Sequence, residues 1–152
     1  INKTDRQLIR DEVIRHFSSE NLVTRGKIYD SAKLPGIIAI ENEKALGFIL
    51  YNINENECEI IAAVSIEIGQ GIGRILMKEM RGITHTAGCN RLWLITTNNN
   101  TAAQLFYESI GFKLVKTHKD AVTISRHLKP EFPEMDAEGI PVRDELEYEL
   151  WI

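Results

Sequence analysis

The sequence predicts a single α+β domain over residues 1–152, and three observations support that prediction. Short apolar strands follow one another closely between residues 37 and 64, as in an antiparallel meander. A glycine-rich turn then opens a helix whose apolar residues recur three and four apart. The remaining chain alternates helix and strand, and no repeat or low-complexity linker divides it.

The elements are predicted in order from periodicity and turn residues. The first part has a helix, an irregular segment and three strands, at residues 4–17, 18–35, 37–40, 45–53 and 57–64. The middle has a helix that opens at the glycine turn and stops near Gly88, then a buried strand, a helix and a strand at residues 91–97, 100–109 and 112–116. The tail has a helix, a proline-containing loop and a strand, at residues 119–129, 130–141 and 144–152.

The last strand alternates strictly, which predicts a half-buried strand with two unlike sides. One side carries Leu146, Tyr148, Leu150 and Ile152. The other carries Glu145, Glu147, Glu149 and Trp151.

Composition excludes several classes of protein. Hydrophobic residues make up 43% and charged residues 26%, which is typical of a globular domain. The net charge is −4 and the cations are scattered, which argues against nucleic acid or a membrane surface as a partner. Cys58 and Cys89 lie in no metal or redox motif, so we expect reduced thiols and no metal. The first ten residues lack the apolar segment of a signal peptide, and we expect a cytoplasmic protein.

The glycine turn is a candidate phosphate site. Gly69, Gly71 and Gly73 join a strand directly to a helix, and glycine lets the backbone approach a ligand closely. The first N–H groups of a helix lack internal partners and lie at the positive end of its dipole. The P-loop pattern is absent, and the dinucleotide fingerprint fails at Arg74 and Leu76. The alternative is a glycine-rich bend that binds nothing.

A second motif follows about thirty residues later, Asn100-x-x-Ala103-x-x-Phe106-Tyr107-x-x-x-Gly111-Phe112. With Gly71-x-Gly73 before it and a buried strand between them, the segment from Leu34 to Val115 resembles the GNAT acetyltransferase superfamily. The region after the second motif resembles a bacterial subgroup of unassigned substrate. The resemblance implies a mixed, mostly antiparallel sheet of about six to seven strands, with helices on both faces. Two central strands would splay to form an acetyl-CoA cleft.

The resemblance also assigns the coenzyme residues. The backbone of the glycine turn would bind the pyrophosphate, through Ile68, Gly69, Gln70, Gly71, Ile72, Gly73 and Arg74. The pantetheine arm would pair with Ala63, Val64 and Ser65, and the second motif adds Asn100, Ala103 and Phe106. One departure is Ile68, which stands where the family usually has Gln or Arg, so a possible phosphate partner is lost.

The reaction implied is direct attack of a neutral amine on acetyl-CoA, without a covalent intermediate or a metal. Tyr107 is the candidate acid for the departing thiolate, although it could be a core aromatic. Glu59 is the first candidate for the base and Glu57 the second, and a solvated strand residue is the alternative for both. Asn100 could contact the coenzyme, cap a helix, or do both.

The acceptor is expected to be a small cationic amine. The tail from Glu131 holds eight acidic residues and one basic residue, Arg143, which would favour a cation unless it is only a solvated face. Two other functions stay open, a non-catalytic acyl-CoA sensor and an acetyltransferase that acts on a protein amine. The terminal strand is a candidate edge for pairing in a homodimer.

Overall fold

The structure is a computed structural model that describes residues 3–17, 21–24, 26–67, 69–128 and 134–152. Its helices are α1 (Lys3–Phe17), α2 (Ile72–Thr86), α3 (Thr101–Ser109) and α4 (Ala121–Leu128). Its strands are β1 (Asn21–Thr24), β2 (Lys27–Asp30), β3 (Gly36–Glu41), β4 (Lys44–Asn54), β5 (Glu57–Ser65), β6 (Arg91–Thr97), β7 (Lys113–His118) and β8 (Glu145–Trp151). The end of the helix predicted at residues 119–129 and the start of the loop after it lie outside the described residues.

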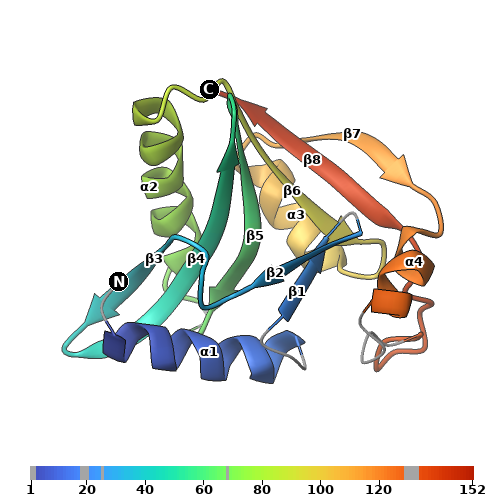
Figure 1. Ribbon diagram of the computed structural model, residues 1–152, viewed down its shortest axis with the longest axis horizontal. Coiled ribbons are helices and arrows are strands. Elements are labelled where there is room, and N and C mark those ends of the chain that lie inside the picture. The colour runs from blue at the N-terminus through green and yellow to red at the C-terminus, as the bar shows by residue number, and fades with distance from the viewer. Residues whose placement is uncertain (1–2, 18–20, 25, 68, 129–133) are drawn as a thin grey trace.

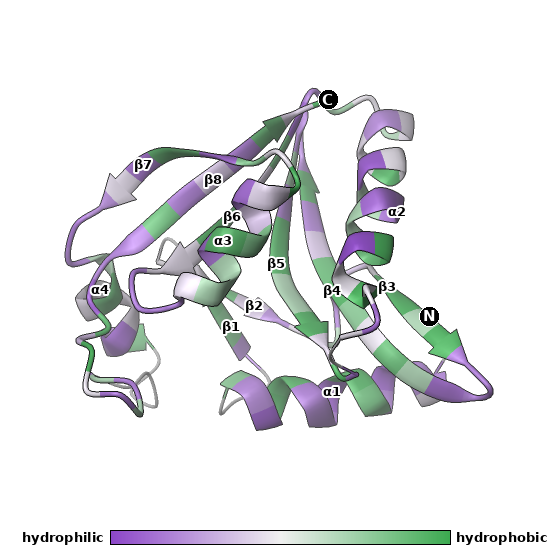
Figure 2. Ribbon diagram, turned by 180° about the vertical axis from the view of Figure 1, so that it is seen from behind, coloured by the Kyte–Doolittle hydropathy of each residue, from purple (hydrophilic) through white to green (hydrophobic). Residues whose placement is uncertain are grey.

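Six strands form the main sheet in the order β3-β4-β5-β6-β8-β7. The β5–β6 pair is parallel, and the other four pairs are antiparallel. Helices α2 and α3 lie on one side of the sheet, toward the viewer in Figure 2, and α1 and α4 lie on the other (Figure 1). This arrangement confirms the predicted mixed, mostly antiparallel sheet between two helical layers. Within the described residues, no helix is long and apolar enough to cross a membrane.

The segment between α1 and β3 is not irregular, as the sequence predicts, but contains a hairpin. Strands β1 and β2 pair antiparallel from Asn21↔Asp30 to Thr24↔Lys27, beside a glycine with a left-handed φ of 74° at Gly26. Strands of four residues are too short for alternation to stand out from noise. The hairpin is held by tertiary contacts instead, since Leu22 is buried against the sheet.

A β-bulge in β5 decides which side chains face which layer. Leu50 pairs with Ala62 and Tyr51 with Ile60, so Ile61 is an extra residue.

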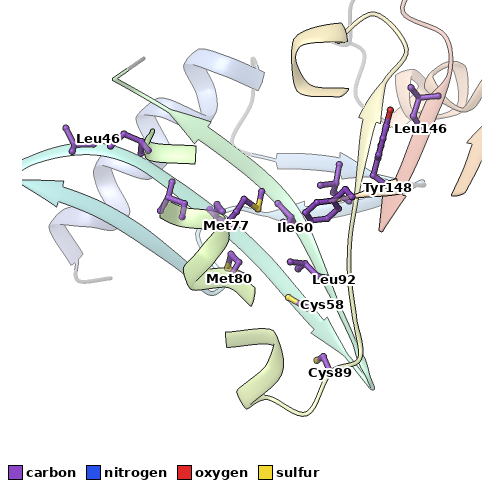
Figure 3. Close-up of a cluster of buried hydrophobic side chains, with 14 residues drawn as sticks. Leu46, Cys58, Ile60, Met77, Met80, Cys89, Leu92, Leu146 and Tyr148 are labelled. Atoms are coloured by element: carbon purple, nitrogen blue, oxygen red, sulfur yellow. The ribbon is translucent and has the colours of Figure 1, made fainter. Parts of the chain in front are cut away.

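The side chains of β5 face different layers before and after this bulge. Before it, Cys58 and Ile60 face α2 and pack with Met80 and Leu92 (Figure 3). After it, Ala62 and Val64 pack in the second core, with α1. Ala63 and Ser65 are thereby left on the α2 side, at the end of the strand.

β8 is buried on both sides over its first four residues, so the predicted half-buried strand is wrong there, and so is the alternative that its glutamates form only a solvated face. Glu145 and Glu147 are only 2% and 7% exposed. The Arg91 guanidinium donates to Glu147 at 2.5 Å and to Glu149 at 2.8 Å, and lies 3.5 Å from Glu57. The alternation itself is correct, since the other side places Tyr148 and Leu146 in the core. Glu147 and Glu149 are paired with Arg91, and Glu145 accepts a hydrogen bond from Ser125 Oγ at 2.8 Å, so each carboxylate has a partner that offsets its burial.

Candidate active site

A cleft of about 730 Å³ opens between the end of β5, the start of α2 and α3. Most of the residues predicted to bind coenzyme line it, namely Ala63, Val64, Ser65, Gly69, Gly71, Ile72, Gly73, Arg74, Asn100, Ala103 and Phe106. The predicted acid Tyr107 lines it too. Gln70 is exposed and is not part of the lining, and Ile68 lies outside the described residues.

The cleft exists because two central strands part. In the described chain, β5 pairs with β6 from Glu57↔Arg91 only as far as Ile60↔Leu94. Beyond that point β6 stays with β8 up to Thr97↔Glu145, while β5 stays with β4 up to Gly47↔Ser65. The divergence is visible where β5 and β6 separate in Figure 1. One edge of residues 61–65 therefore offers backbone donors and acceptors to an extended ligand.

The turn at the mouth of the cleft has the backbone of an anion site. Gly69 and Gly71 have φ values of 87° and 70°, a conformation that other residues adopt only with strain. Gly71 is the N-cap of α2 and offers no side chain to its free N–H groups. The nearby carboxylate of Glu67 is neutralised by an ion pair with Lys44. A negatively charged ligand is therefore not repelled at this helix end.

Gly73 has a different reason to be glycine. A Cβ at this position would lie 2.9 Å from the Phe106 ring, so the missing side chain lets α2 pack directly on α3. Gly47 acts similarly beneath α2, since its Cβ would lie 2.7 Å from the Val64 carbonyl oxygen. Of the glycines predicted to admit phosphate, one thus serves helix packing.

The second motif supplies the opposite wall. The Asn100 side chain accepts a hydrogen bond from the Ala103 N–H at 3.2 Å, so it caps α3 and also lines the cleft. The Tyr107 ring packs on Phe106 and Phe112, with centroids 5.4 and 5.6 Å away. Burial raises the pKa of Tyr107 to about 12, so its phenol stays protonated throughout the neutral range.

Glu59 does not reach this cleft. It lies on the other side of the sheet in a cavity of about 240 Å³, roofed by the β1–β2 hairpin. Glu59 is 6% exposed and accepts a hydrogen bond from Thr24 Oγ1 at 3.0 Å. In the parallel pairing of β5 with β6, Glu59 lies opposite Trp93, one pair before the two strands separate. The second candidate base, Glu57, lines the same cavity.

Sequence reasoning missed residues that come from distant elements. His16 and Phe17, at the end of α1, line the cleft, and Thr24, Lys27 and Tyr29 of the hairpin line the smaller cavity. No motif marks these positions, because their roles depend on how α1 and the hairpin dock on the sheet.

A nucleophilic cysteine finds no support in the structure. Cys58 and Cys89 are both free and buried, and burial raises the pKa of Cys58 to about 11. A thiol held protonated in an apolar core is a poor nucleophile. Within the described residues, no group of three or more His, Cys, Asp or Glu side chains is arranged to hold a metal ion.

Comparisons with known proteins agree with this architecture. Residues 6–112 match the Acetyltransferase (GNAT) family. The "Uncharacterized protein YdhI" of Bacillus subtilis (strain 168) is 33% identical over 146 residues, which cover 95% of this chain and 91% of that protein. The IAA acetyltransferase from Bacillus cereus ATCC 14579 has a TM-score of 0.71 at 19% identity, over 99% of this chain and 93% of that one.

A GNAT family acetyltransferase from Elizabethkingia anophelis, solved with acetyl-CoA bound, has a TM-score of 0.68 at 19% identity. The match covers all of this chain and 92% of that chain. At such identities the structural likeness shows the fold alone. The assignment to a family rests instead on the family match over residues 6–112 and on the relative that is 33% identical. The chain belongs to the GNAT family of acetyltransferases.

Proposed function

We propose that this protein transfers an acetyl group from acetyl-CoA to a primary amine by direct attack, without a covalent intermediate. The observation that carries the proposal is the cleft itself. It joins an uncapped helix N-terminus and a left-handed glycine turn to an unpaired strand edge. An anion site leading into an open strand edge suits a ligand with a pyrophosphate at one end and an amide-containing arm behind it.

The residues that would hold acetyl-CoA follow from this layout. Backbone N–H groups from Gly69 to Arg74 would bind the pyrophosphate, and the open edge at Ala63–Ser65 would pair with the pantetheine amides. Asn100, Ala103 and Phe106 would form the opposite wall. A backbone N–H of the open edge would stabilise the oxyanion that develops on the acetyl carbonyl. These roles use backbone groups, so Ile68 in place of Gln or Arg removes only one contact.

Tyr107 would assist the departing thiolate by donating a hydrogen bond. Its pKa of about 12 lies well above the value of about 8.5 for an ordinary thiol, so full proton transfer to the thiolate is unfavourable. A hydrogen bond to an ionised acceptor needs no transfer, and such bonds are stronger than neutral ones.

The acceptor amine would bind in the smaller cavity and reach the acetyl group through the gap between β5 and β6. Glu59 would take the amine's proton through a water, with Glu57 as the alternative base. Glu57 is the weaker candidate because it lies 3.5 Å from the Arg91 guanidinium. The hairpin roof and the modest volume favour a small amine over a lysine on a folded protein.

Two measurements test the proposal. Calorimetric titration with acetyl-CoA should show micromolar binding, and a panel of polyamines, amino acids and aminoglycosides should include amines that release free CoA. Binding without turnover on any amine would favour the non-catalytic sensor, while turnover only on proteins would move the acceptor site out of the smaller cavity. No binding would overturn the proposal.

A further inference from the structure

We propose that a row of cations on α2, formed by Arg74, Lys78 and Arg81, recognises the 3′-phosphate of coenzyme A. The protein would then discriminate coenzyme A from its dephosphorylated form. The inference rests on the proposed use of acetyl-CoA and adds a second anion site to it, away from the pyrophosphate turn.

The three cations share one side of the helix. They are spaced by four and then three residues, which places them one above another along α2. Glu79 is the acidic residue of this helix, and a turn of 100° per residue sets it on a different side from the row.

All three cations are exposed, and among the described residues none of them is in an ion pair. The Arg74 guanidinium does bond to Ser109 Oγ at 3.3 Å. In a protein of net charge −4, such a row is a local positive field, and no ion pair within the described part of the chain offsets it.

The row borders a third cavity of about 520 Å³. Arg74 and Met77 line both this cavity and the cleft, so the two adjoin. Its other walls are Lys78 and Arg81 on the helix and the apolar side chains of Ile110, Phe112 and Leu150. An apolar surface edged by cations is suited to a purine that carries a phosphate on its ribose.

The distances along the helix fit a ligand anchored at the turn. Lys78 and Arg81 lie about 9 and 14 Å along the helix from its first residue, Ile72. The pyrophosphate would bind at that first turn, and the nucleotide end would leave the cleft past Arg74. Ile68 stands where the family usually has Gln or Arg, so one side-chain contact to the pyrophosphate is lost. Contacts to the 3′-phosphate would then contribute a larger share of the affinity for coenzyme A.

Calorimetry with coenzyme A and with dephospho-coenzyme A tests the inference. Wild-type protein should bind coenzyme A about tenfold more tightly, as expected for a charge-assisted contact at a partly solvated site. The double variant Lys78→Gln/Arg81→Gln should lose that preference while its affinity for dephospho-coenzyme A stays unchanged. Raising the salt concentration should shrink the wild-type preference, because exposed charges are screened.

A matched control removes two cations elsewhere. Lys116→Gln/Lys119→Gln changes the net charge equally but at the end of β7, the sheet edge opposite β3, and should keep the preference. Equal wild-type affinity for both ligands would overturn the inference and leave the acetyltransferase proposal standing. A double variant that weakens both ligands equally would also overturn it. Failure of the wild type to bind either ligand would overturn both proposals.

Discussion

The two cavities on opposite sides of the sheet are built in different ways. The larger cleft, proposed to bind acetyl-CoA, is lined mainly by two short stretches, within residues 63–77 and 100–107. Its features are backbone features: an unpaired edge, left-handed glycines and a helix end. The smaller cavity gathers side chains from β1, β2, β4, β5 and β6, and it adjoins the buried Arg91 network. A backbone site should therefore tolerate most side-chain changes, whereas a side-chain site should not.

The largest effect is expected at Arg91, because it is the cation between Glu57, Glu147 and Glu149. Arg91→Met should lower the free energy of unfolding by about 3–5 kcal/mol, since it removes the guanidinium that donates to Glu147 and Glu149 at a largely buried site. Urea denaturation at pH 7 measures this loss.

Two variants sharpen that result. Lys116→Met, which removes an exposed cation on β7, should change stability by less than about 0.5 kcal/mol. Adding Glu147→Gln to Arg91→Met should recover part of the loss. A loss below about 1 kcal/mol at Arg91 would mean that water screens the network as at a surface.

Glu59→Gln should reduce kcat roughly 100-fold, as expected when a general base is lost, and leave acetyl-CoA affinity unchanged. The glutamine can still accept the Thr24 hydrogen bond, so the fold should survive. Steady-state kinetics with the best amine of the panel checks this, and Glu57→Gln is the matched comparison. Equal losses in both variants would remove the distinction between Glu59 and Glu57 as the base, and a loss in coenzyme affinity would break the separation between the two cavities.

Gly71→Val should weaken acetyl-CoA binding about tenfold, because a left-handed residue other than glycine costs roughly 1–2 kcal/mol and its side chain obstructs the helix end. Gly88→Val is the control, since Gly88 has a similar φ of 78° in open space at the other end of α2. Both variants should lose similar stability, and only the first should lose affinity. Wild-type affinity in Gly71→Val would contradict the anion-site assignment.

The smallest effect is expected at Tyr107. Tyr107→Phe should lower kcat about tenfold, because it removes one hydrogen bond to the charge that develops on the thiolate. The affinity for acetyl-CoA should stay nearly unchanged. Because the pKa of Tyr107 is about 12, the phenol stays almost fully protonated up to pH 10, and the variant should keep the wild-type pH profile of kcat over that range. Unchanged turnover would remove Tyr107 from the reaction.

The sequence predicted the main sheet well, since β3 to β8 all appear within a few residues of their expected bounds. Their periodicity and turn residues are local signals. The β1–β2 hairpin was missed because its strands are short and depend on docking. The glutamate side of β8 was misjudged because burial of a charge depends on a partner, Arg91, nearly sixty residues away in the sequence.

The cleft could also be predicted from the sequence, because its glycine turn and the Asn100–Phe112 motif are each contiguous in sequence. The position of Glu59 could not be predicted, because the bulge at Ile61 reverses which side chains of β5 face each layer. Glu59 and Ala63 have the same parity in the sequence, yet they line cavities on opposite sides of the sheet.

Amide hydrogen exchange with and without saturating acetyl-CoA tests the central claim most directly. We predict slower exchange at the open edge of β5, residues 61–65, and at the first N–H groups of α2, residues 72–74, with no change in the β1–β2 hairpin. Protection confined to the hairpin, or no protection at the open edge, would show that acetyl-CoA does not bind between β5 and β6 and would contradict this account.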